Sequence, residues 1–266
     1  MTMAEQNQEM PDLRAPNNPN SHIKKVIGVI SGKGGVGKSL TTSILAAKAV
    51  REGKKVGIID ADITGPSIPT IFGLSGMVRG TEESIIPMET RTGIKVISLN
   101  LLTDDPAAPV IWRGPVISGL IKQFWTNVEW GEIDELYVDM PPGTGDVPLT
   151  VFQSLPVDAV ICVATPQDLV SLIVEKAVRM ANMMDIPMVG LVMNMAYMVC
   201  PHCNELVYPF GEGKVEALAN HFGIPFCGEL PIDPSLAEAC DEGRIEDLPL
   251  NYLDEIYDAI CRIRSK

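Results

Sequence analysis

The stretch VIGVISGKGGVGKS, residues 26–39, decides how this chain folds. It opens with six mostly apolar residues that suit a buried strand and continues into a turn with four glycines. From Gly32 the turn matches the pattern G-x-x-x-x-G-K-[ST], whose backbone N–H groups curl around phosphate oxygens. Residues 38–52 then carry apolar side chains at helical spacing and stop before Gly53. A strand, a glycine-rich turn and a helix in this order predict a P-loop, which binds the phosphates of a nucleotide.

Outward from this loop the chain keeps alternating short apolar runs with helical segments. The runs are apolar almost throughout, which indicates strands of a parallel sheet that are buried on both faces. We therefore predict one α/β domain of the P-loop NTPase class over residues 23–266, with a single doubly wound, mostly parallel sheet and helices on both faces. Residues 1–22, polar and rich in Asn and Pro, are predicted to form a disordered tail. The predicted strands are residues 26–31, 55–60, 94–99, 135–140, 159–165, 187–194 and 225–230, and helices are expected near 38–52, 116–124 and 168–184.

The charge and composition of the chain narrow its partners. It has 266 residues and a formal net charge of -13, from 34 acidic against 21 basic side chains. An acidic chain is repelled by nucleic acid and by anionic membranes, so we expect neither as a partner. The N-terminus lacks the basic start and apolar run of a signal peptide, and no run approaches the roughly 20 apolar residues of a membrane helix. The sequence therefore predicts a cytoplasmic protein.

Within the P-loop, two side chains add chemistry to that of the backbone. Lys38 is placed to reach the β- and γ-phosphates of ATP, and the Ser39 hydroxyl is placed to bind Mg²⁺. The predicted nucleotide-binding residues of the loop are Gly32, Lys33, Gly34, Gly35, Val36, Gly37, Lys38, Ser39 and Leu40.

Three aspartates lie where predicted strands end. Asp60 and Asp62 follow one strand, and Asp139 ends another in the pattern of a Walker B motif. Phosphoryl transfer needs carboxylates for the Mg²⁺ shell and a group that positions the attacking water. A single Asp near a turn more often caps the backbone. Three of them at strand ends beside one P-loop favour a catalytic role.

The sequence Cys200-Pro201-His202-Cys203 brings two thiols close together. Two thiolates at this spacing can bind one metal centre, but Zn²⁺ or a [4Fe–4S] cluster each needs four ligands. A second copy across a two-fold axis is the simplest way to complete the set, which predicts a homodimer. A structural zinc site and a dithiol redox loop remain alternatives, and we expect His202 to be exposed rather than a ligand. The other cysteines, Cys162, Cys227, Cys240 and Cys261, are predicted to be buried structural thiols.

Six further segments give the chain a specific resemblance. Together with the P-loop they occur in the same order in the Mrp/ApbC family of iron–sulfur carrier ATPases, and the resemblance covers roughly residues 22–245. The string KGGVGKS is also similar to the deviant Walker A pattern of the wider group that includes MinD and the nitrogenase iron protein. The segments are DADITGPSIP (60–69), WRGP (112–115), YVDMPPGTGD (137–146), TPQD (165–168), NMAYMVCPHC (194–203) and ELPIDP (229–234).

This resemblance implies roles for particular residues. Lys33 would contact a nucleotide phosphate across a dimer interface, as an arginine finger does. Asp62 would orient the attacking water, and Asp60 and Asp139 would join Ser39 around Mg²⁺. Asn194 is similar to the residue that recognises adenine, although an Asn that simply ends a strand is an equally good interpretation. Relatives usually carry Thr where this chain has Leu40, so we expect a weaker contact with the α-phosphate.

The resemblance implies an ATP-hydrolysing carrier that assembles a [4Fe–4S] cluster at a homodimer interface and transfers it to apoproteins. Its cofactors would be ATP and Mg²⁺, with Zn²⁺ replacing the cluster in aerobically prepared protein. One alternative is a MinD-like positioning ATPase with zinc at the interface, and another is a reductase like the nitrogenase iron protein. The apolar residues between 250 and 260 have helical spacing, but the polar face carries Asp254, Glu255 and Asp258. We therefore predict that this helix packs on the core and does not bind lipid.

Overall fold

The centre of the molecule is an eight-stranded sheet in the order β14-β11-β10-β2-β9-β3-β7-β6. The computed structural model describes residues 14–62, 65–81, 83–102, 114–166, 170–212 and 215–263. All neighbouring strands of this sheet are parallel except β6 and β7. The predicted mostly parallel sheet is thus confirmed. The strands are β2 (Val26–Ser31), β3 (Val56–Asp60), β6 (Met88–Glu89), β7 (Lys95–Ser98), β9 (Glu135–Asp139), β10 (Ala159–Ala164), β11 (Met188–Met193) and β14 (Phe226–Glu229).

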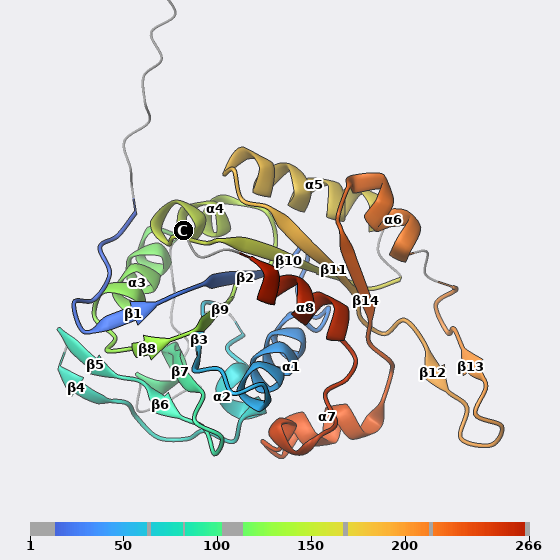
Figure 1. The fold of residues 1–266 in the computed structure, drawn as a ribbon, viewed down its shortest axis with the longest axis horizontal. Helices are drawn as coiled ribbons and strands as arrows, with labels where there is room; N and C mark the ends of the chain where they lie inside the picture. Colours follow the sequence, from blue (N-terminus) through green and yellow to red (C-terminus); the bar gives the residue numbers. More distant parts are fainter. Residues whose placement is uncertain are drawn as a thin grey trace, which may run out of the picture.

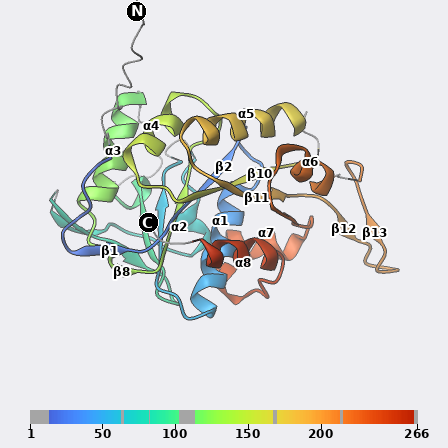
Figure 2. The same ribbon diagram turned by 45° about the horizontal axis from the view of Figure 1, so that its top comes forward.

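Helices cover both faces of the sheet (Figure 1). One face carries α3, α4, α5 and α6, and the other carries α1, α2, α7 and α8, an arrangement that the turned view in Figure 2 repeats. The helices are α1 (Lys38–Arg51), α2 (Ile68–Ile71), α3 (Gly114–Thr126), α4 (Asp146–Ser154), α5 (Val170–Met183), α6 (Val215–Phe222), α7 (Pro234–Asp241) and α8 (Asp254–Arg262), with short 3-10 turns at Leu99–Leu101 and Ile245–Asp247. The residues before Val170 in the helix expected from 168 lie outside the described ranges.

The side chains of β2 explain why the strands are apolar throughout. Val26 and Ile30 belong to the core beneath α3 to α6, whereas Ile27 and Val29 belong to the core beneath α1 and α8. Successive side chains of a strand point to opposite faces, so a strand covered on both sides must be apolar at every position. This central strand delivers the glycine-rich loop to the middle of the sheet edge.

Three two-stranded sheets lie outside the central one and were not expected from the sequence. β1 (Ser21–Ile23) pairs with β8 (Gly131–Ile133), and β4 (Arg79–Thr81) pairs with β5 (Ser84–Ile86). β12 (Met198–Val199) pairs with β13 (Leu206–Val207) in a hairpin that stands away from the body of the molecule in Figure 1. Strands of two or three residues are too short to show a periodic pattern.

The segment before β2 corrects the predicted boundary of the tail. Residues 21–23 form β1, and Asn18 is buried. The backbone N–H of Ala15 donates to Ser154 O over 2.8 Å, and Trp125 Nε1 donates to Ala15 O over 3.1 Å. The prediction of a disordered tail over residues 1–22 is therefore wrong for residues 14–22, which contact the domain. Residues 1–13 lie outside the described part of the chain.

The C-terminal helix packs on the core, as predicted. Ile256 and Ile260 of α8 are fully buried. A methyl group at Gly228 would lie 2.9 Å from Leu253 Cδ2, and one at Gly190 would lie 3.2 Å from Ile256 Cγ2. Small residues on β11 and β14 thus let the helix approach the sheet closely. Among the described residues, no helix combines the length and the apolar character that a bilayer crossing requires.

Candidate functional site

The glycine-rich loop joins β2 to α1, and its glycines have two different uses. Gly35 (φ 77°) and Gly37 (φ 89°) adopt the left-handed conformation that side chains disfavour. A methyl group at Gly34 or Gly35 would meet no atom within 4 Å, so the space above these residues is open to a ligand. At Gly32, in contrast, a methyl group would lie 1.9 Å from Ile173 Cγ2. The loop therefore has the shape and the access that a phosphate group needs.

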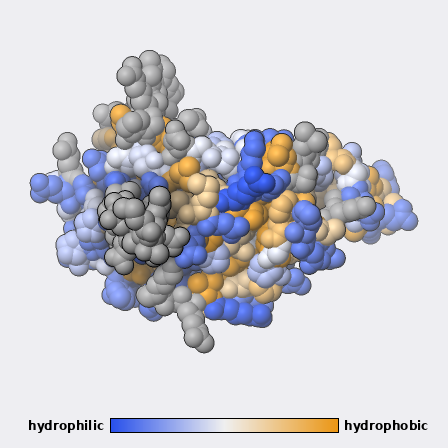
Figure 3. Space-filling model, turned by 90° about the horizontal axis from the view of Figure 1, so that it is seen from above, coloured by the Kyte–Doolittle hydropathy of each residue, from blue (hydrophilic) through white to orange (hydrophobic). Residues whose placement is uncertain are grey.

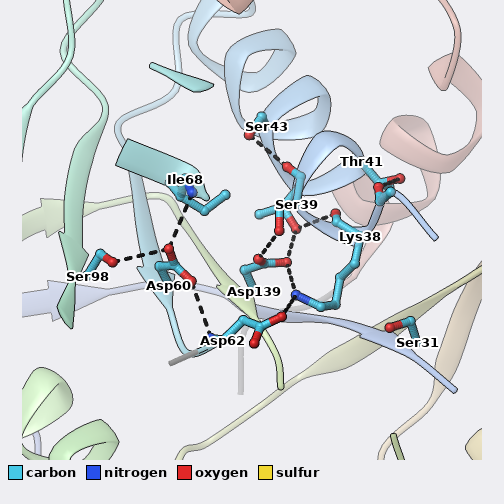
Figure 4. Close-up of polar contacts among 12 residues, drawn as sticks. Ser31, Lys38, Ser39, Thr41, Ser43, Asp60, Asp62, Ile68, Ser98 and Asp139 are labelled. Carbon is cyan, nitrogen blue, oxygen red and sulfur yellow. Dashed lines mark hydrogen bonds and ion pairs between the residues drawn. The ribbon is translucent and has the colours of Figure 1, made fainter. Parts of the chain in front are cut away.

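Asp139 is the centre of a buried polar network at the start of α1 (Figure 4). Ser39 Oγ donates to Asp139 Oδ2 over 2.5 Å, and Thr42 Oγ1 donates to Asp139 Oδ1 over 3.0 Å. Lys38 Nζ lies 2.9 Å from Asp139 Oδ1. Because Asp139 is level with Val29 on the neighbouring β2, it ends its strand directly beneath the loop. The network thus brings three of the predicted site residues together.

The ammonium group of Lys38 is buried among carboxylates. It lies 3.5 Å from Asp62 Oδ2 as well as near Asp139, yet no described side chain accepts a well-aligned hydrogen bond from it. Burial by itself lowers the pKa of Lys38, but the charges of Asp139 and Asp62 outweigh burial and raise the pKa above its ordinary value. Lys38 is therefore a permanent cation with hydrogen-bonding capacity left for a phosphate oxygen.

Asp60 has a capping role in this structure. Its Oδ1 accepts from the Asp62 N–H (3.2 Å), and its Oδ2 accepts from the Ile68 N–H (3.3 Å) and Ser98 Oγ (3.2 Å). Burial, together with the charge of Asp139, raises the pKa of Asp60 well above the ordinary value. These bonds fix the start of the segment that leads to α2. The geometry thus supports the common capping role of an Asp near a turn, and the predicted place in a Mg²⁺ shell receives no support from it.

The remaining predicted residues of the loop differ in how exposed their side chains are. Val36 is in the core, and Leu40 is half-buried and packs against it, so Leu40 offers a phosphate its backbone alone. Lys33 is exposed on the loop, where its carbonyl accepts a hydrogen bond from Ser31 Oγ (2.9 Å). A contact of Lys33 with a second subunit stays a prediction.

Asn194, directly after β11, contacts the loop from below. Its side chain is buried, and Nδ2 donates to Val36 O over 2.9 Å. The recorded partner of this amide is thus the loop backbone. Recognition of adenine by Asn194 stays a prediction.

The two neighbouring cysteines lie in the turn of the β12–β13 hairpin, residues 198–207, which we call the cysteine hairpin. Hydrogen bonds from Cys200 N to Glu205 O and from Asn204 N to Cys200 O, both 2.9 Å, close the turn. Cys203 is exposed, and Cys200 is half-exposed. Hydrogen bonds from the backbone N–H groups of His202 and Cys203, followed by one from the Cys203 side chain, lower the pKa of Cys200 below its ordinary value. A lowered pKa favours the thiolate, which is the metal-binding form.

Exposed apolar side chains lie on both strands of the cysteine hairpin. Figure 3 shows that apolar and hydrophilic residues alternate over the face that carries α3 to α6, out to the hairpin end of the molecule. The exposed apolar residues on and beside the cysteine hairpin are Val199, Leu206, Val207 and Phe210.

The other cysteines fit the predicted structural role with one exception. Cys162 is buried, and burial is the main cause that raises the pKa of the half-buried Cys227 and Cys240. Cys261 is exposed at the end of α8, so its predicted burial is wrong. The helical pattern of residues 250–260 favoured a buried position, but Cys261 falls one residue beyond the apolar face.

Sequence analysis missed two site residues. Thr42 could have been found, because it lies one helical turn after Lys38 on the same face of α1. Ser98 gives no such signal, because it comes to Asp60 only through the pairing of β3 with β7.

Comparisons with known proteins agree with this geometry. The model of the family described as NUBPL iron-transfer P-loop NTPase matches residues 22–263. The iron-sulfur cluster carrier protein of Clostridium perfringens is 47% identical over 234 residues, spanning 85% of this chain and 82% of the relative. The protein of the same name from Methanocaldococcus jannaschii is 46% identical over 236 residues, spanning 88% of this chain and 80% of the relative.

Comparison of the whole fold with solved structures gives a similar result. The nucleotide-binding protein of Archaeoglobus fulgidus, in complex with ADP and with cobalt, has a TM-score of 0.77 and 46% identity over 85% of this chain and 90% of its own. MinD of Pyrococcus furiosus has a TM-score of 0.61 at 16% identity, with 90% of this chain and 99% of that chain covered, so the likeness to it concerns the fold. The resemblance found in the sequence motifs is confirmed. The chain belongs to the NUBPL iron-transfer P-loop NTPase family.

Proposed function

We propose that this chain is an ATP-hydrolysing carrier that holds a [4Fe–4S] cluster between two copies of itself and transfers the cluster to apoproteins. The observation that carries the proposal is the pair Cys200 and Cys203, accessible thiols on a projecting hairpin of a P-loop NTPase. Iron–sulfur clusters are held by cysteine thiolates, and a cluster that is to be handed on needs exposed ligands.

The ligand count supports a homodimer. Within the described ranges, no group of three or more His, Cys, Asp or Glu side chains is arranged to hold one metal ion. Each chain therefore contributes two thiolates, and four require a second copy related by two-fold symmetry. The exposed Val199, Leu206 and Val207 beside the thiols give that contact an apolar surface to bury.

The nucleotide site suits ATP with Mg²⁺. Ser39 and Asp139 would hold the ion, since a hydroxyl and a carboxylate oxygen meet beneath the loop at the start of α1. Mg²⁺ in this place neutralises charge on the β- and γ-phosphates. Lys38 turns from its carboxylates to the phosphates, and Asp62, released from Lys38, orients the water. Lys33 is exposed on the loop, where it reaches the nucleotide of the partner subunit.

Anaerobic reconstitution with iron and sulfide tests this proposal. We expect the wild type to take up iron, absorb in the visible range and run as a dimer, and Cys200→Ala/Cys203→Ala to retain almost no iron. Cys261→Ala removes an equally exposed thiol outside the hairpin and should load like the wild type. A wild type that stays monomeric and binds no iron would refute the proposal.

The same samples decide between a cluster and zinc. Two thiolates from each subunit also suit tetrahedral Zn²⁺, as the alternative of a zinc-bridged positioning ATPase requires. Metal analysis that finds one Zn²⁺ per dimer, resistant to exchange for iron and sulfide, would favour that alternative.

A further inference from the structure

We infer that Asn194 is a positioning residue that links the P-loop to the cysteine hairpin, so that nucleotide binding changes the accessibility of Cys200 and Cys203. The inference deepens the proposed function and rests on it, because it names how the nucleotide site of the carrier regulates the thiol site. Its basis is the set of contacts that Asn194 makes with the loop and that residues 195–208 make with the sheet edge.

On the loop side, Asn194 is fixed at both its backbone and its side chain. Its N–H donates to Ala164 O over 2.8 Å at the end of β10, while Nδ2 donates to Val36 O over 2.9 Å. The side chain is 4% exposed. A methyl group at Gly37 would lie 2.0 Å from Nδ2, so the amide fills the space beneath the last turn of the loop. The loop and the amide must therefore move together.

On the hairpin side, the chain is tied to the sheet edge immediately after Asn194. Met195 has φ 57°, a left-handed conformation that a residue with a side chain keeps only when its surroundings impose it. Ala196 N donates to Leu230 O over 3.0 Å, and Ile232 N donates to Tyr197 O over 2.6 Å. Between Asn194 and Tyr197, Met195 is strained and Ala196 is hydrogen-bonded to Leu230. A displacement of Asn194 is therefore passed on to Tyr197, because no flexible segment separates them.

The two ends of the cysteine hairpin are held together. Tyr197 precedes β12 and Tyr208 follows β13, and their rings pack edge to face with centroids 6.5 Å apart. Because both ends are joined, a shift at Tyr197 turns the hairpin as a unit. Cys200 and Cys203 lie in the turn between β12 and β13. This turn is the part of the hairpin farthest from the sheet in Figure 1, where a small rotation gives the largest displacement.

Nucleotide binding gives this link a signal to transmit. A phosphate group would attract Lys38, which here lies 2.9 Å from Asp139 and 3.5 Å from Asp62, and would accept hydrogen bonds from the backbone N–H groups of the loop. A ligand shifts an equilibrium only through contacts that differ between two states, and in this inference the bond from Asn194 to Val36 O is the contact that differs. Coupling between sites typically changes an equilibrium about 5- to 150-fold, and a link through one hydrogen bond belongs at the lower end.

Alkylation of the hairpin thiols tests the link without any iron. Full-length reduced protein is treated with iodoacetamide, and the rate at each cysteine is read from peptide masses without nucleotide and with saturating Mg-ATP. In the wild type we expect ATP to change the rates at Cys200 and Cys203 about fivefold. In Asn194→Leu, which keeps the branching of the side chain at Cγ but loses the N–H donor, we expect less than a twofold change. Cys261, exposed on α8, is the internal reference and should not respond.

Two further variants serve as controls for Asn194→Leu. Met195→Gly accepts the left-handed conformation freely, so it loosens the link while keeping the Asn194 side chain, and it should also weaken the response. If Asn194→Leu fails to fold, the thiol response of Met195→Gly is the test of the link. Asn182→Leu changes an exposed Asn of α5 and should behave like the wild type. A fluorescent ATP analogue verifies that each variant is saturated.

The possible results separate this inference from its rivals. If Asn194 only recognises the adenine base, Asn194→Leu loses its preference for ATP over GTP, but the alkylation rates of its hairpin thiols still respond fully at saturating ATP. This result refutes the link. A wild type whose thiols ignore ATP refutes it as well. A wild type whose thiols respond but which loads no iron upholds the link and refutes the cluster-carrying function instead.

Discussion

The polar side chains at the base of the nucleotide site contact partners from other segments of the chain. Lys38, Ser39 and Thr42 of α1 all contact Asp139 of β9, and Ser98 of β7 contacts Asp60 of β3. Removing one partner leaves the other buried without its counterpart, which costs more than the contact contributed. The effects of single substitutions follow from this arrangement.

Thr42 should be needed for stability as well as for placing Asp139. Thr42→Val removes a donor from a fully buried carboxylate, so we expect the free energy of unfolding to fall by about 1–3 kcal/mol. Urea unfolding at neutral pH measures this. Thr42→Ser keeps the hydroxyl and should lose less than half as much, and a larger loss in Thr42→Ser than in Thr42→Val would mean that the methyl group contributes more than the hydroxyl.

Lys38 should be essential for hydrolysis. Lys38→Met keeps the length of the side chain and removes the charge, so we expect the rate of phosphate release from ATP to fall at least about a hundredfold. Lys176→Met, at an exposed position on α5, is the matched control and should retain full activity. Activity within tenfold of the wild type in Lys38→Met would rule out direct contact with the phosphates.

The roles of single residues were predictable only where the pattern itself carries the chemistry. The spacing from Gly32 to Ser39 is sufficient for the P-loop, because the backbone does most of the binding there. The capping role of Asp60 depends on Ser98 and Ile68, and the contact of Asn194 depends on Val36, 158 residues away. No local pattern contains the pairs Asp60–Ser98 and Asn194–Val36.

At the scale of elements, the burial of a strand determined whether the sequence predicted it. β2 and β10 matched their predictions closely, because strands buried on both faces must be apolar without interruption. β1 and the cysteine hairpin were missed, because they have two or three residues and are largely polar or exposed. The position of β1 follows from pairing with the distant β8, which a sequence window does not contain.

The packing of α8 gives an element-scale prediction. Ile256 is fully buried against Gly190 and Gly228, so Ile256→Ala leaves a cavity that rigid strands cannot close. We expect a loss of about 2–5 kcal/mol in the free energy of unfolding, measured by denaturant titration. Asp258→Ala on the exposed side of the same helix should change it by less than about 0.5 kcal/mol. Similar values for both would mean that α8 is frayed in solution.

The turn of the cysteine hairpin gives a pH prediction. Backbone hydrogen bonds lower the pKa of Cys200, whereas burial raises the pKa of Cys240. Because the thiolate is the reactive form, alkylation of Cys200 should reach half its maximal rate below the ordinary thiol pKa of 9.0, and alkylation of Cys240 above it. Peptide-resolved alkylation between pH 6 and pH 11 measures both curves, and the opposite order would contradict the hydrogen-bonded geometry of the turn.

At the scale of the whole molecule, the sheet order separates the two functional regions. β2 delivers the P-loop to the middle of the sheet, whereas the cysteine hairpin extends beyond the β11–β14 end (Figure 1). In the proposed dimer, two copies would therefore hold one cluster between their cysteine hairpins while each copy binds a nucleotide in its own P-loop.

A charge on the hairpin should prevent this assembly. In the proposed dimer, Val207→Asp would put two carboxylates close to the two-fold axis, so we expect reconstituted protein to be monomeric by light scattering and to hold less than a fifth of the wild-type iron. Leu172→Asp, at an exposed apolar position on α5, is the control and should remain dimeric. A dimeric, fully loaded Val207→Asp would place the interface elsewhere.

The ion pairs of Lys38 also decide which anions the nucleotide site admits. Asp139 and Asp62 act as built-in counter-ions, so any incoming anion has to compete with them for one ammonium group. Orthophosphate offers a single phosphoryl group and brings added repulsion from both carboxylates. A triphosphate chelated to Mg²⁺ has about half of its negative charge offset by the ion and offers several more oxygens to the loop. The site should thus ignore free phosphate at the concentrations found in cells and open for the metal-bound nucleotide.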